Sequence, residues 1–288
     1  MTPPGRADHL DIDVGDALRL HVERGGTGPP LLLLHGFMGA AASWSALTDE
    51  LSPRFTTLAV DLPGHGRSTA PSSPARYSLD RFADDLELLL DALGIARIAA
   101  LGYSLGGRAA LRFALAHPDR CAALVLESAS PGIADGAARA RRAASDHALA
   151  DDLDQCGVRA FVDRWEQLPL WESQRTLPAA IRAAQREIRV ANRGAGLANS
   201  LRGAGAGADP SVHDRLGGLD VPTLVVAGAL DEKYVSIGRA MSALIPSVRL
   251  TVVPRAGHAV HLEQPVALAE VVGAFLSSVA EADGGWRR

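Results

Sequence analysis

Short apolar runs alternate along the chain with segments of helical periodicity. The apolar runs predict buried strands at residues 31–34, 57–60, 98–101, 122–126, 223–227 and 250–253. Apolar positions recur at helical spacing in residues 44–51, 79–93, 105–116, 236–244 and 265–279. Strands that are apolar on both faces and alternate with helices predict a mostly parallel sheet with helices on both faces. Residues 18–22 alternate between apolar and polar side chains, which predicts an antiparallel edge strand.

The pattern changes between residues 131 and 210, where no buried strand is predicted. A Gly- and Ala-rich stretch at residues 201–210 predicts a flexible link at the end of this region. We therefore expect an α/β core with a mostly parallel sheet from residues 1–130 and 211–288. Residues 131–210 would form a helical cap over the carboxyl edge of the sheet, where open parallel sheets bind ligands. The helices of this cap are predicted from amphipathic stretches at residues 137–149, 158–166 and 177–192.

Composition and charge narrow the class of protein. The 288 residues carry a formal net charge of −4, which argues against a general nucleic-acid binder. We expect neither a membrane span nor a signal peptide, because long apolar stretches and a basic N-terminal region are absent from the sequence. Cys121 and Cys156 form no C-x-x-C pattern, and Cys121 opens an apolar run that favours burial. These features predict a cytoplasmic protein without disulfides.

A nucleophile elbow is predicted around Ser104. The sequence Gly102-Tyr-Ser-Leu-Gly106 follows the predicted strand at 98–101 and opens the predicted helix at 105–116. In a G-x-S-x-G motif with these flanks, a sharp turn exposes the serine hydroxyl at a helix N-terminus, which favours negative charge. Ser104 is therefore the candidate reactive residue.

A reactive serine needs a base and an acid that orients the base. His258 and Asp231 each lie in a loop just after a predicted strand. The order Ser104, Asp231, His258 is the nucleophile–acid–base order of α/β-hydrolases, and one edge of the sheet can gather all three side chains. Glu127, which ends another predicted strand, is an alternative acid; its other interpretation is a structural role at the strand end.

Two backbone N–H groups are predicted to form an oxyanion hole. One belongs to Leu105, the residue after the reactive serine. The other belongs to Phe37, because Gly36 permits a tight turn that would direct this amide inward.

The remaining histidines have structural interpretations. We expect His35 and His65 to hold loops by hydrogen bonds, and His261 to have a solvent or loop role. No His, Cys or carboxylate cluster shows metal-ligand spacing along the sequence, so no metal site is predicted.

Arginine supplies all but one of the 29 basic residues, since Lys233 is the only lysine. Arg108 lies four residues after Ser104, one helical turn further along and beside the reactive serine. A guanidinium group binds a carboxylate through two parallel hydrogen bonds. Arg108 therefore predicts a substrate that carries a carboxylate, with a salt bridge inside the fold as the alternative.

These residues resemble the α/β-hydrolase superfamily, and within it the MenH family, the 2-succinyl-6-hydroxy-2,4-cyclohexadiene-1-carboxylate synthases of menaquinone biosynthesis. The resemblance covers nearly the whole chain, from His35-Gly-Phe to His258. Its distinctive segments are Asp61-Leu-Pro-Gly-His-Gly, Gly102-Tyr-Ser-Leu-Gly-Gly-Arg108, Glu127-Ser-Ala-Ser-Pro-Gly132, Arg139-Ala-Arg-Arg142, Phe161-Val-Asp-Arg-Trp165, Leu201-Arg-Gly-Ala-Gly and Val253-Pro-Arg-Ala-Gly-His258.

The resemblance implies a substrate site in addition to the triad. The matching positions for substrate binding are Tyr103, Arg108, Arg142, Trp165 and Arg189. The family's substrate is a small molecule with three carboxylates, which convergent arginines under a helical cap would suit. Neither a metal nor an organic cofactor is implied, and the sequence does not indicate the oligomeric state.

The implied reaction is an elimination. Pyruvate would leave 2-succinyl-5-enolpyruvoyl-6-hydroxy-3-cyclohexene-1-carboxylate to give 2-succinyl-6-hydroxy-2,4-cyclohexadiene-1-carboxylate. Ser104, activated by His258, would remove a ring proton, and the oxyanion hole would hold the developing enolate oxygen. One alternative is a serine esterase or C–C bond hydrolase that uses the same triad. Another is a non-catalytic ligand-binding protein with this fold.

Overall fold

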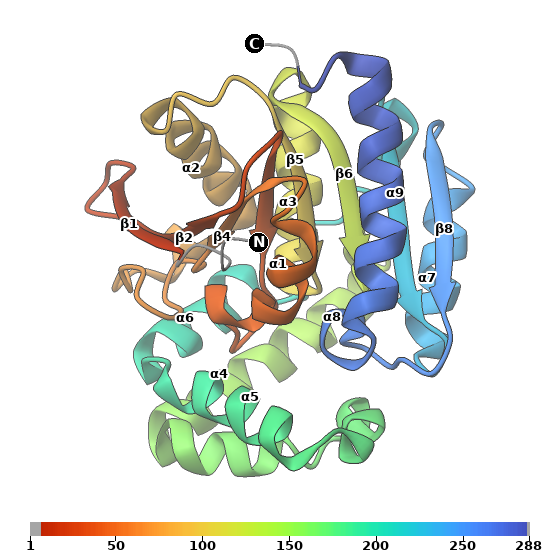
Figure 1. Ribbon diagram of the computed structural model, residues 1–288. Helices are drawn as coiled ribbons and strands as arrows, with labels where there is room; N and C mark the ends of the chain where they lie inside the picture. The colour runs from red at the N-terminus through yellow and green to blue at the C-terminus, as the bar shows by residue number, and fades with distance from the viewer. Residues whose placement is uncertain (1–6, 287–288) are drawn as a thin grey trace.

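An eight-stranded sheet forms the centre of the computed structural model, which describes residues 7–286 (Figure 1). The strands follow the order β1-β2-β4-β3-β5-β6-β7-β8 across the sheet. β2 pairs antiparallel with β1 and β4, and every pair from β4 to β8 is parallel. The strands are β1 Asp8–Asp13, β2 Arg19–Gly25, β3 Pro30–Leu34, β4 Thr56–Val60, β5 Ile98–Tyr103, β6 Cys121–Glu127, β7 Thr223–Gly228 and β8 Val248–Val253.

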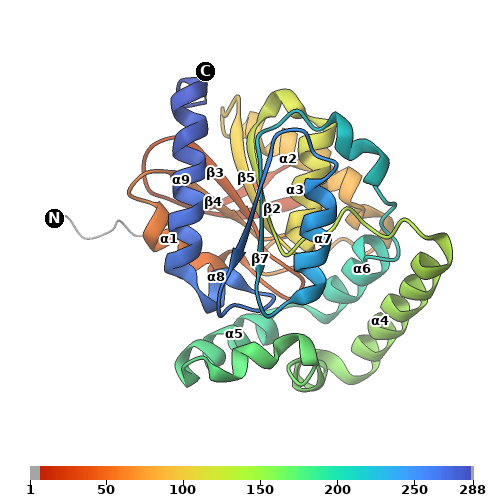
Figure 2. The same ribbon diagram turned by 90° about the vertical axis from the view of Figure 1, so that its right-hand side faces the viewer.

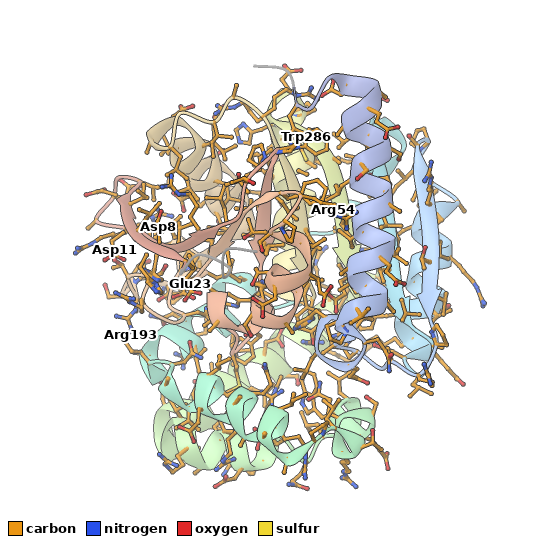
Figure 3. All side chains as sticks on the ribbon, viewed as in Figure 1. Asp8, Asp11, Glu23, Arg54, Arg193 and Trp286 are labelled. Atoms are coloured by element: carbon orange, nitrogen blue, oxygen red, sulfur yellow. The ribbon has the colours of Figure 1, made fainter. Side chains whose placement is uncertain are left out.

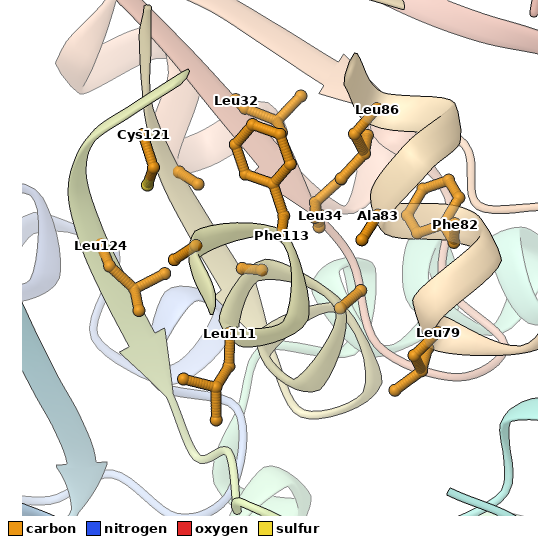
Figure 4. Close-up of a cluster of buried hydrophobic side chains, with 14 of the residues drawn as sticks. Leu32, Leu34, Leu79, Phe82, Ala83, Leu86, Leu111, Phe113, Cys121 and Leu124 are labelled. Carbon is orange, nitrogen blue, oxygen red and sulfur yellow. The ribbon is translucent and has the colours of Figure 1, made fainter. Parts of the chain in front are cut away.

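Helices cover both faces of the sheet, as its doubly apolar strands require (Figure 2). α2, α3 and α7 pack on one face, and α1 and α9 pack on the other. Figure 4 shows part of the first core cluster, which contains Leu32 and Leu34 of β3, Phe82 of α2 and Phe113 of α3. The helices outside the β6–β7 connection are α1 Ser45–Leu51, α2 Leu79–Ala92, α3 Leu105–Ala116, α7 Glu232–Ser242, α8 Val260–Glu263 and α9 Pro265–Asp283.

The structure confirms the α/β-hydrolase fold and corrects the prediction at both edges of the sheet. Residues 18–22 fall in β2, which is antiparallel as expected but is not the edge strand, because β1 covers it. The strand predicted at residues 250–253 as buried is β8, the opposite edge, and Val252 on it is exposed. Apolar character alone does not distinguish an edge strand from a central one.

Between β6 and β7 the chain forms helices that lie beyond the carboxyl ends of the parallel strands (Figures 1 and 2). α4 breaks at Gly157, whose φ of 77° is non-helical, so two of the predicted cap helices are halves of one element. The third predicted helix corresponds to α5. The division of the chain at residues 130 and 211 stays a prediction. The helices of this region are α4 Gly136–Trp165, α5 Ala179–Ala191 and α6 Gly194–Ala204.

The flexible link predicted at residues 201–210 is wrong. α6 extends to Ala204, and the glycines of this stretch serve close packing. A Cβ on Gly203 would lie 2.0 Å from the backbone oxygen of Pro74, and a Cβ on Gly207 would lie 2.0 Å from the backbone nitrogen of Ala143. Glycine is required here because backbones approach each other, not because the segment bends freely.

α9 is the one described helix that is long and apolar enough to cross a membrane by length and composition. Its apolar side chains, among them Leu268 and Val272, pack into the second core cluster. This is the environment of a helix that covers a sheet. Cys121 is buried as expected, and Cys156 is half-buried; both are free thiols.

Candidate active site

The Gly102–Gly106 segment forms the predicted elbow between β5 and α3. Ser104 has φ 52° and ψ −107°, a conformation that side-chain-bearing residues rarely adopt. Its backbone N–H donates to the carbonyl of Glu127 on β6 at 2.9 Å. A Cβ on Gly106 would lie 2.0 Å from the backbone oxygen of Leu34, so the tight crossing of β3 and α3 requires glycine. The turn therefore holds Ser104 above the carboxyl edge of the sheet.

The structure brings the three predicted triad residues together in one hydrogen-bonded chain. His258 Nδ1 and Asp231 Oδ2 are 2.7 Å apart, and His258 Nε2 is 3.2 Å from Ser104 Oγ. Both His258 and Asp231 are buried. If Nδ1 carries the proton donated to Asp231, Nε2 is left to accept the proton of the serine hydroxyl. The arrangement can therefore raise the basicity of Ser104 Oγ.

Glu127, the alternative acid, lies at the end of β6 and serves a different histidine. Its Oε1 accepts from the backbone N–H of His261 at 3.0 Å and lies 2.8 Å from His261 Nδ1. Glu127 is fully buried and His261 is 5% exposed. The solvent role expected for His261 is therefore wrong, because α8 turns this side chain into the protein.

Two buried carboxylates hold the loop that carries His258. Glu263 Oε2 accepts from the N–H of Gly257 at 2.7 Å, and its Oε1 accepts from the N–H of Ala259 at 3.4 Å. The backbone N–H groups of the residues before and after His258 are thus bound to one side chain. Glu127 holds the same loop two residues further along through His261. Glu263 was not predicted as a site residue. Its only signal in the sequence is its position at the end of the short helix α8, which begins two residues after His258.

The two predicted oxyanion-hole residues, Phe37 and Leu105, lie together in the wall of one cavity beside Ser104. Leu105 is the first residue of α3, and the N–H groups of a first helical turn have no carbonyl of a preceding turn to bond. A Cβ on Gly36 would lie 2.6 Å from the ring of Tyr103, so a side chain there would push Phe37 from its position. The role of the two amides stays a prediction.

The cavity beside Ser104 has a volume of about 190 Å³ and lies between the sheet edge and the helices of the β6–β7 connection. Four of the five predicted substrate-binding residues line it: Tyr103, Arg108, Arg142 and Trp165. Among the described residues that line it there are three cations and no carboxylate. The structure adds residues that the sequence did not indicate, among them Trp171, Lys233 and Tyr234.

Arg108 lines the cavity and also makes the salt bridge that was its alternative interpretation. Its Nη1 is 3.1 Å from Asp209 Oδ2, and its Nη2 donates to the carbonyl of Ala204. Arg112, one turn further along α3, binds the other oxygen of Asp209 at 2.7 Å. Two guanidinium groups therefore share one buried carboxylate, and Arg112 also lies 3.2 Å from the exposed Asp80. Burial lowers the pKa of Arg108, and the nearby Asp209 opposes this shift.

Arg142 and Lys233 contribute charge from opposite sides of the cavity. Arg142 Nε donates to Asp146 Oδ1 at 2.7 Å, one turn along α4. This bond leaves the two terminal nitrogens of the guanidinium group as donors beside the cavity. Lys233, the only lysine of the chain, comes from the first turn of α7.

Arg189 does not line the cavity that contains Ser104. It borders a neighbouring cavity of about 340 Å³, and its guanidinium group lies 5.2 Å from the ring centre of Trp171. Its Nη1 is 2.9 Å from Glu166 Oε1. Trp171 lines both cavities. A substrate contact by Arg189 stays a prediction.

Aromatic side chains surround the imidazole of His258. The ring of Tyr234 lies 4.6 Å from it and that of Trp171 lies 5.9 Å from it, between ring centres. The indole N–H groups of Trp165 and Trp171 are buried and have no partner among the described residues. Tyr234 lies three residues after Asp231, in the first turn of α7. This short spacing from the predicted acid was the only feature of the sequence that pointed to Tyr234.

His35 and His65 hold loops by hydrogen bonds, as predicted. His35 Nδ1 lies 2.7 Å from the carbonyl oxygen of Gly36, and its Nε2 accepts from the N–H of Leu62 at 3.0 Å. Burial lowers the pKa of His35 to about 4 and the pKa of His65 to about 3. Both imidazoles are therefore neutral at neutral pH.

Comparison with known proteins gives a consistent result. The family model described as alpha/beta hydrolase fold matches residues 29–265. A putative 2-succinyl-6-hydroxy-2,4-cyclohexadiene-1-carboxylate synthase from Bacillus subtilis is 40% identical over 272 residues, which cover 94% of this chain and 99% of that protein. The structure of MenH from S. aureus has a TM-score of 0.85 and 32% identity, covering 97% of this chain and 99% of that one. A malate-bound esterase from Thermogutta terrifontis has a TM-score of 0.82 and 27% identity, with coverage of 96% and 99%.

Proposed function

The chain belongs to the alpha/beta hydrolase fold family and, within it, to the 2-succinyl-6-hydroxy-2,4-cyclohexadiene-1-carboxylate synthases, and we propose that the Ser104 site carries out this synthase reaction. The protein is thus a lyase of menaquinone biosynthesis. Its substrate is a small molecule that carries three carboxylates. A cytoplasmic location is part of this proposal.

The chemistry follows from the hydrogen-bonded chain. The proton of Ser104 Oγ passes to His258 Nε2, and Oγ then removes the ring proton α to the succinyl ketone. The C–H electron pair enters the ring, the ring double bond shifts, and the C–O bond to the enolpyruvyl group breaks. The departing enolpyruvate takes up a proton to become pyruvate. Asp231 holds the imidazole in the required tautomer and stabilises its charged form.

The charge of the cavity wall carries the proposal for the substrate. Arg108, Arg142 and Lys233 face the cavity, and no carboxylate among the described residues lines it. Charged hydrogen bonds in a site that excludes water orient a polyanion more strongly than the same bonds in water. Arg108 and Arg142 each keep one carboxylate partner inside the fold, and a tricarboxylate would add anionic partners on the cavity side that a neutral ester cannot supply.

A serine hydrolase is the rival function, because the same triad can form an acyl-enzyme. The structural similarity to the esterase from Thermogutta terrifontis supports this alternative. The malate bound to that esterase is itself a dicarboxylate. The two functions differ in what Ser104 does. As a base it forms no covalent intermediate, whereas as a nucleophile it is acylated.

The deciding experiment supplies 2-succinyl-5-enolpyruvoyl-6-hydroxy-3-cyclohexene-1-carboxylate to the purified protein. Synthase activity releases pyruvate, measured with lactate dehydrogenase, together with an equal amount of a conjugated-diene chromophore. p-Nitrophenyl acetate serves as the parallel substrate. Rapid release of nitrophenol with no pyruvate would overturn the proposal in favour of a hydrolase.

A further inference from the structure

We propose that His9, His21 and Glu23 form a binding site for a divalent transition metal, best suited to Zn²⁺, on the β1–β2 hairpin. One nitrogen or oxygen atom from each side chain lies within 4.8 Å of the others. The hairpin is at the edge of the sheet opposite β8, so the site is separate from the Ser104 cavity. Figure 3 shows Asp11 and Glu23 together on this hairpin.

Strand register brings these residues to one face. His9 pairs with Glu23 and Asp11 pairs with His21 across the two antiparallel strands. Side chains two residues apart point to the same side of a strand, so all four lie on one face of the hairpin. The intervening positions are apolar and pack toward the core; Leu10 and Val22 are examples. The polar face is therefore a consequence of the alternating pattern.

The distances fit a tetrahedral metal. Zn–N bonds of about 2.0–2.1 Å at a tetrahedral angle place two nitrogen ligands about 3.3–3.4 Å apart. His9 Nδ1 and His21 Nε2 are 3.3 Å apart. His9 Nδ1 is 3.9 Å from Glu23 Oε1, on a side chain that is long enough to adjust. Imidazole and carboxylate ligands are the set that zinc accepts, and a water would complete the four.

Asp11 fixes the tautomer that His21 needs as a ligand. Its Oδ1 lies 2.7 Å from His21 Nδ1, so that nitrogen carries the proton and Nε2 presents its lone pair toward His9. Histidine ligands of zinc commonly donate their other N–H to a carboxylate in this way.

A metal would also connect the edge strand to the sheet. His9 lies on β1, and the other two ligands lie on β2, so a bound ion crosslinks the hairpin. His21 is buried, whereas the side chains of His9 and Glu23 are partly exposed and leave a path for entry. His9 Nδ1 and His21 Nε2 already face each other at 3.3 Å, and a metal between them would take the place of this N–H···N contact once His9 carries its proton on Nε2.

Calorimetric titration of the full chain with Zn²⁺, after treatment with a chelator, tests the site. We expect one equivalent to bind and the thermal unfolding midpoint to rise, because a ligand that binds only the folded state stabilises it. His9→Ala should weaken binding by about tenfold or more and abolish the rise. His9 is partly exposed, so this variant should fold. The matched control is His147→Ala, which removes an exposed histidine from α4.

Cobalt gives a second readout of the ligands. Co²⁺ bound by nitrogen and oxygen alone gives visible absorption without the strong near-ultraviolet bands that a Cys156 thiolate would add. Glu23→Gln should reduce both this spectrum and Zn²⁺ affinity, and His147→Ala should leave both unchanged. Equal Zn²⁺ affinity in the wild type, His9→Ala and Glu23→Gln would overturn the proposal, as would no Zn²⁺ binding by the wild type.

Discussion

Substitution of Arg108 by methionine separates its two interactions, with the fold and with a substrate. Arg108 binds Asp209 and the carbonyl of Ala204, and it also lines the cavity. Arg112 provides a matched control, because it binds the same carboxylate and the carbonyl of Pro210 but does not line the cavity. The pair Arg108→Met and Arg112→Met therefore differs mainly in access to the ligand.

The two variants should lose similar stability. A hydrogen bond to a charged group contributes about 1.5–3 kcal/mol. Each arginine makes two short bonds of this kind and a third, weaker contact, which is the Gly205 carbonyl at 3.4 Å for Arg108 and the exposed Asp80 at 3.2 Å for Arg112. Asp209 keeps one guanidinium partner after either substitution, so we expect a loss near the lower end for the two short bonds, about 3 kcal/mol. For a chain of this size that corresponds to a fall in Tm of roughly 6–12 °C. The free energies of unfolding can be compared by urea denaturation.

Their activities should differ. If Arg108 binds a substrate carboxylate, its loss removes about 3 kcal/mol of binding in the transition state, or about a hundredfold in kcat/KM. Arg112→Met should stay within about threefold of the wild type, because it leaves the cavity wall unchanged. The assay is pyruvate release at a temperature well below both midpoints. Equal kcat/KM values for the two variants would refute a substrate contact by Arg108 and leave only its salt bridge.

Two further predictions concern the His258 loop and the buried histidines. Glu263→Gln replaces a charged acceptor of the Gly257 N–H with a neutral one, so kcat should fall about fivefold to tenfold with KM nearly unchanged; an unchanged kcat would remove Glu263 as a positioning residue. The folded-state pKa of His65, about 3, lies below the value of about 6.5 of an unfolded histidine, so the unfolded state binds the proton first as the pH falls. Its contribution to the free energy of unfolding therefore declines as the pH falls from about 6 to about 4, by up to ~1.4 kcal/mol per pH unit. Urea denaturation of His65→Gln should show a smaller pH slope than the wild type in this window, and identical slopes would contradict the assignment.

The elements that carry the active site could be predicted from the sequence because their signals are local. A buried strand is an uninterrupted apolar run, and the elbow at Ser104 needs glycines at fixed positions. The order of Ser104, Asp231 and His258 then restricts them to one edge of a parallel sheet. Their hydrogen bonds follow from that topology.

The features that were missed depend on contacts between distant segments. Asp209, which binds Arg108, lies 101 residues away in the chain, in a stretch whose glycines suggest a flexible link. The metal-ligand cluster depends on the register of β1 against β2, and β1 itself is a polar edge strand with few apolar positions. The register of β1 against β2 cannot be read from the spacing of residues along the sequence.

The most direct test of the central claim is the rate of pyruvate and diene formation by Ser104→Ala relative to the wild type. The account predicts equimolar pyruvate and diene from the wild type. It predicts a fall in kcat of about a thousandfold or more for Ser104→Ala, because the base is lost. Substrate affinity, measured separately by titration of this variant, should be largely kept, since the cations of the cavity remain. A Ser104→Ala variant with the wild-type rate, or a wild type that forms neither product, would contradict the account.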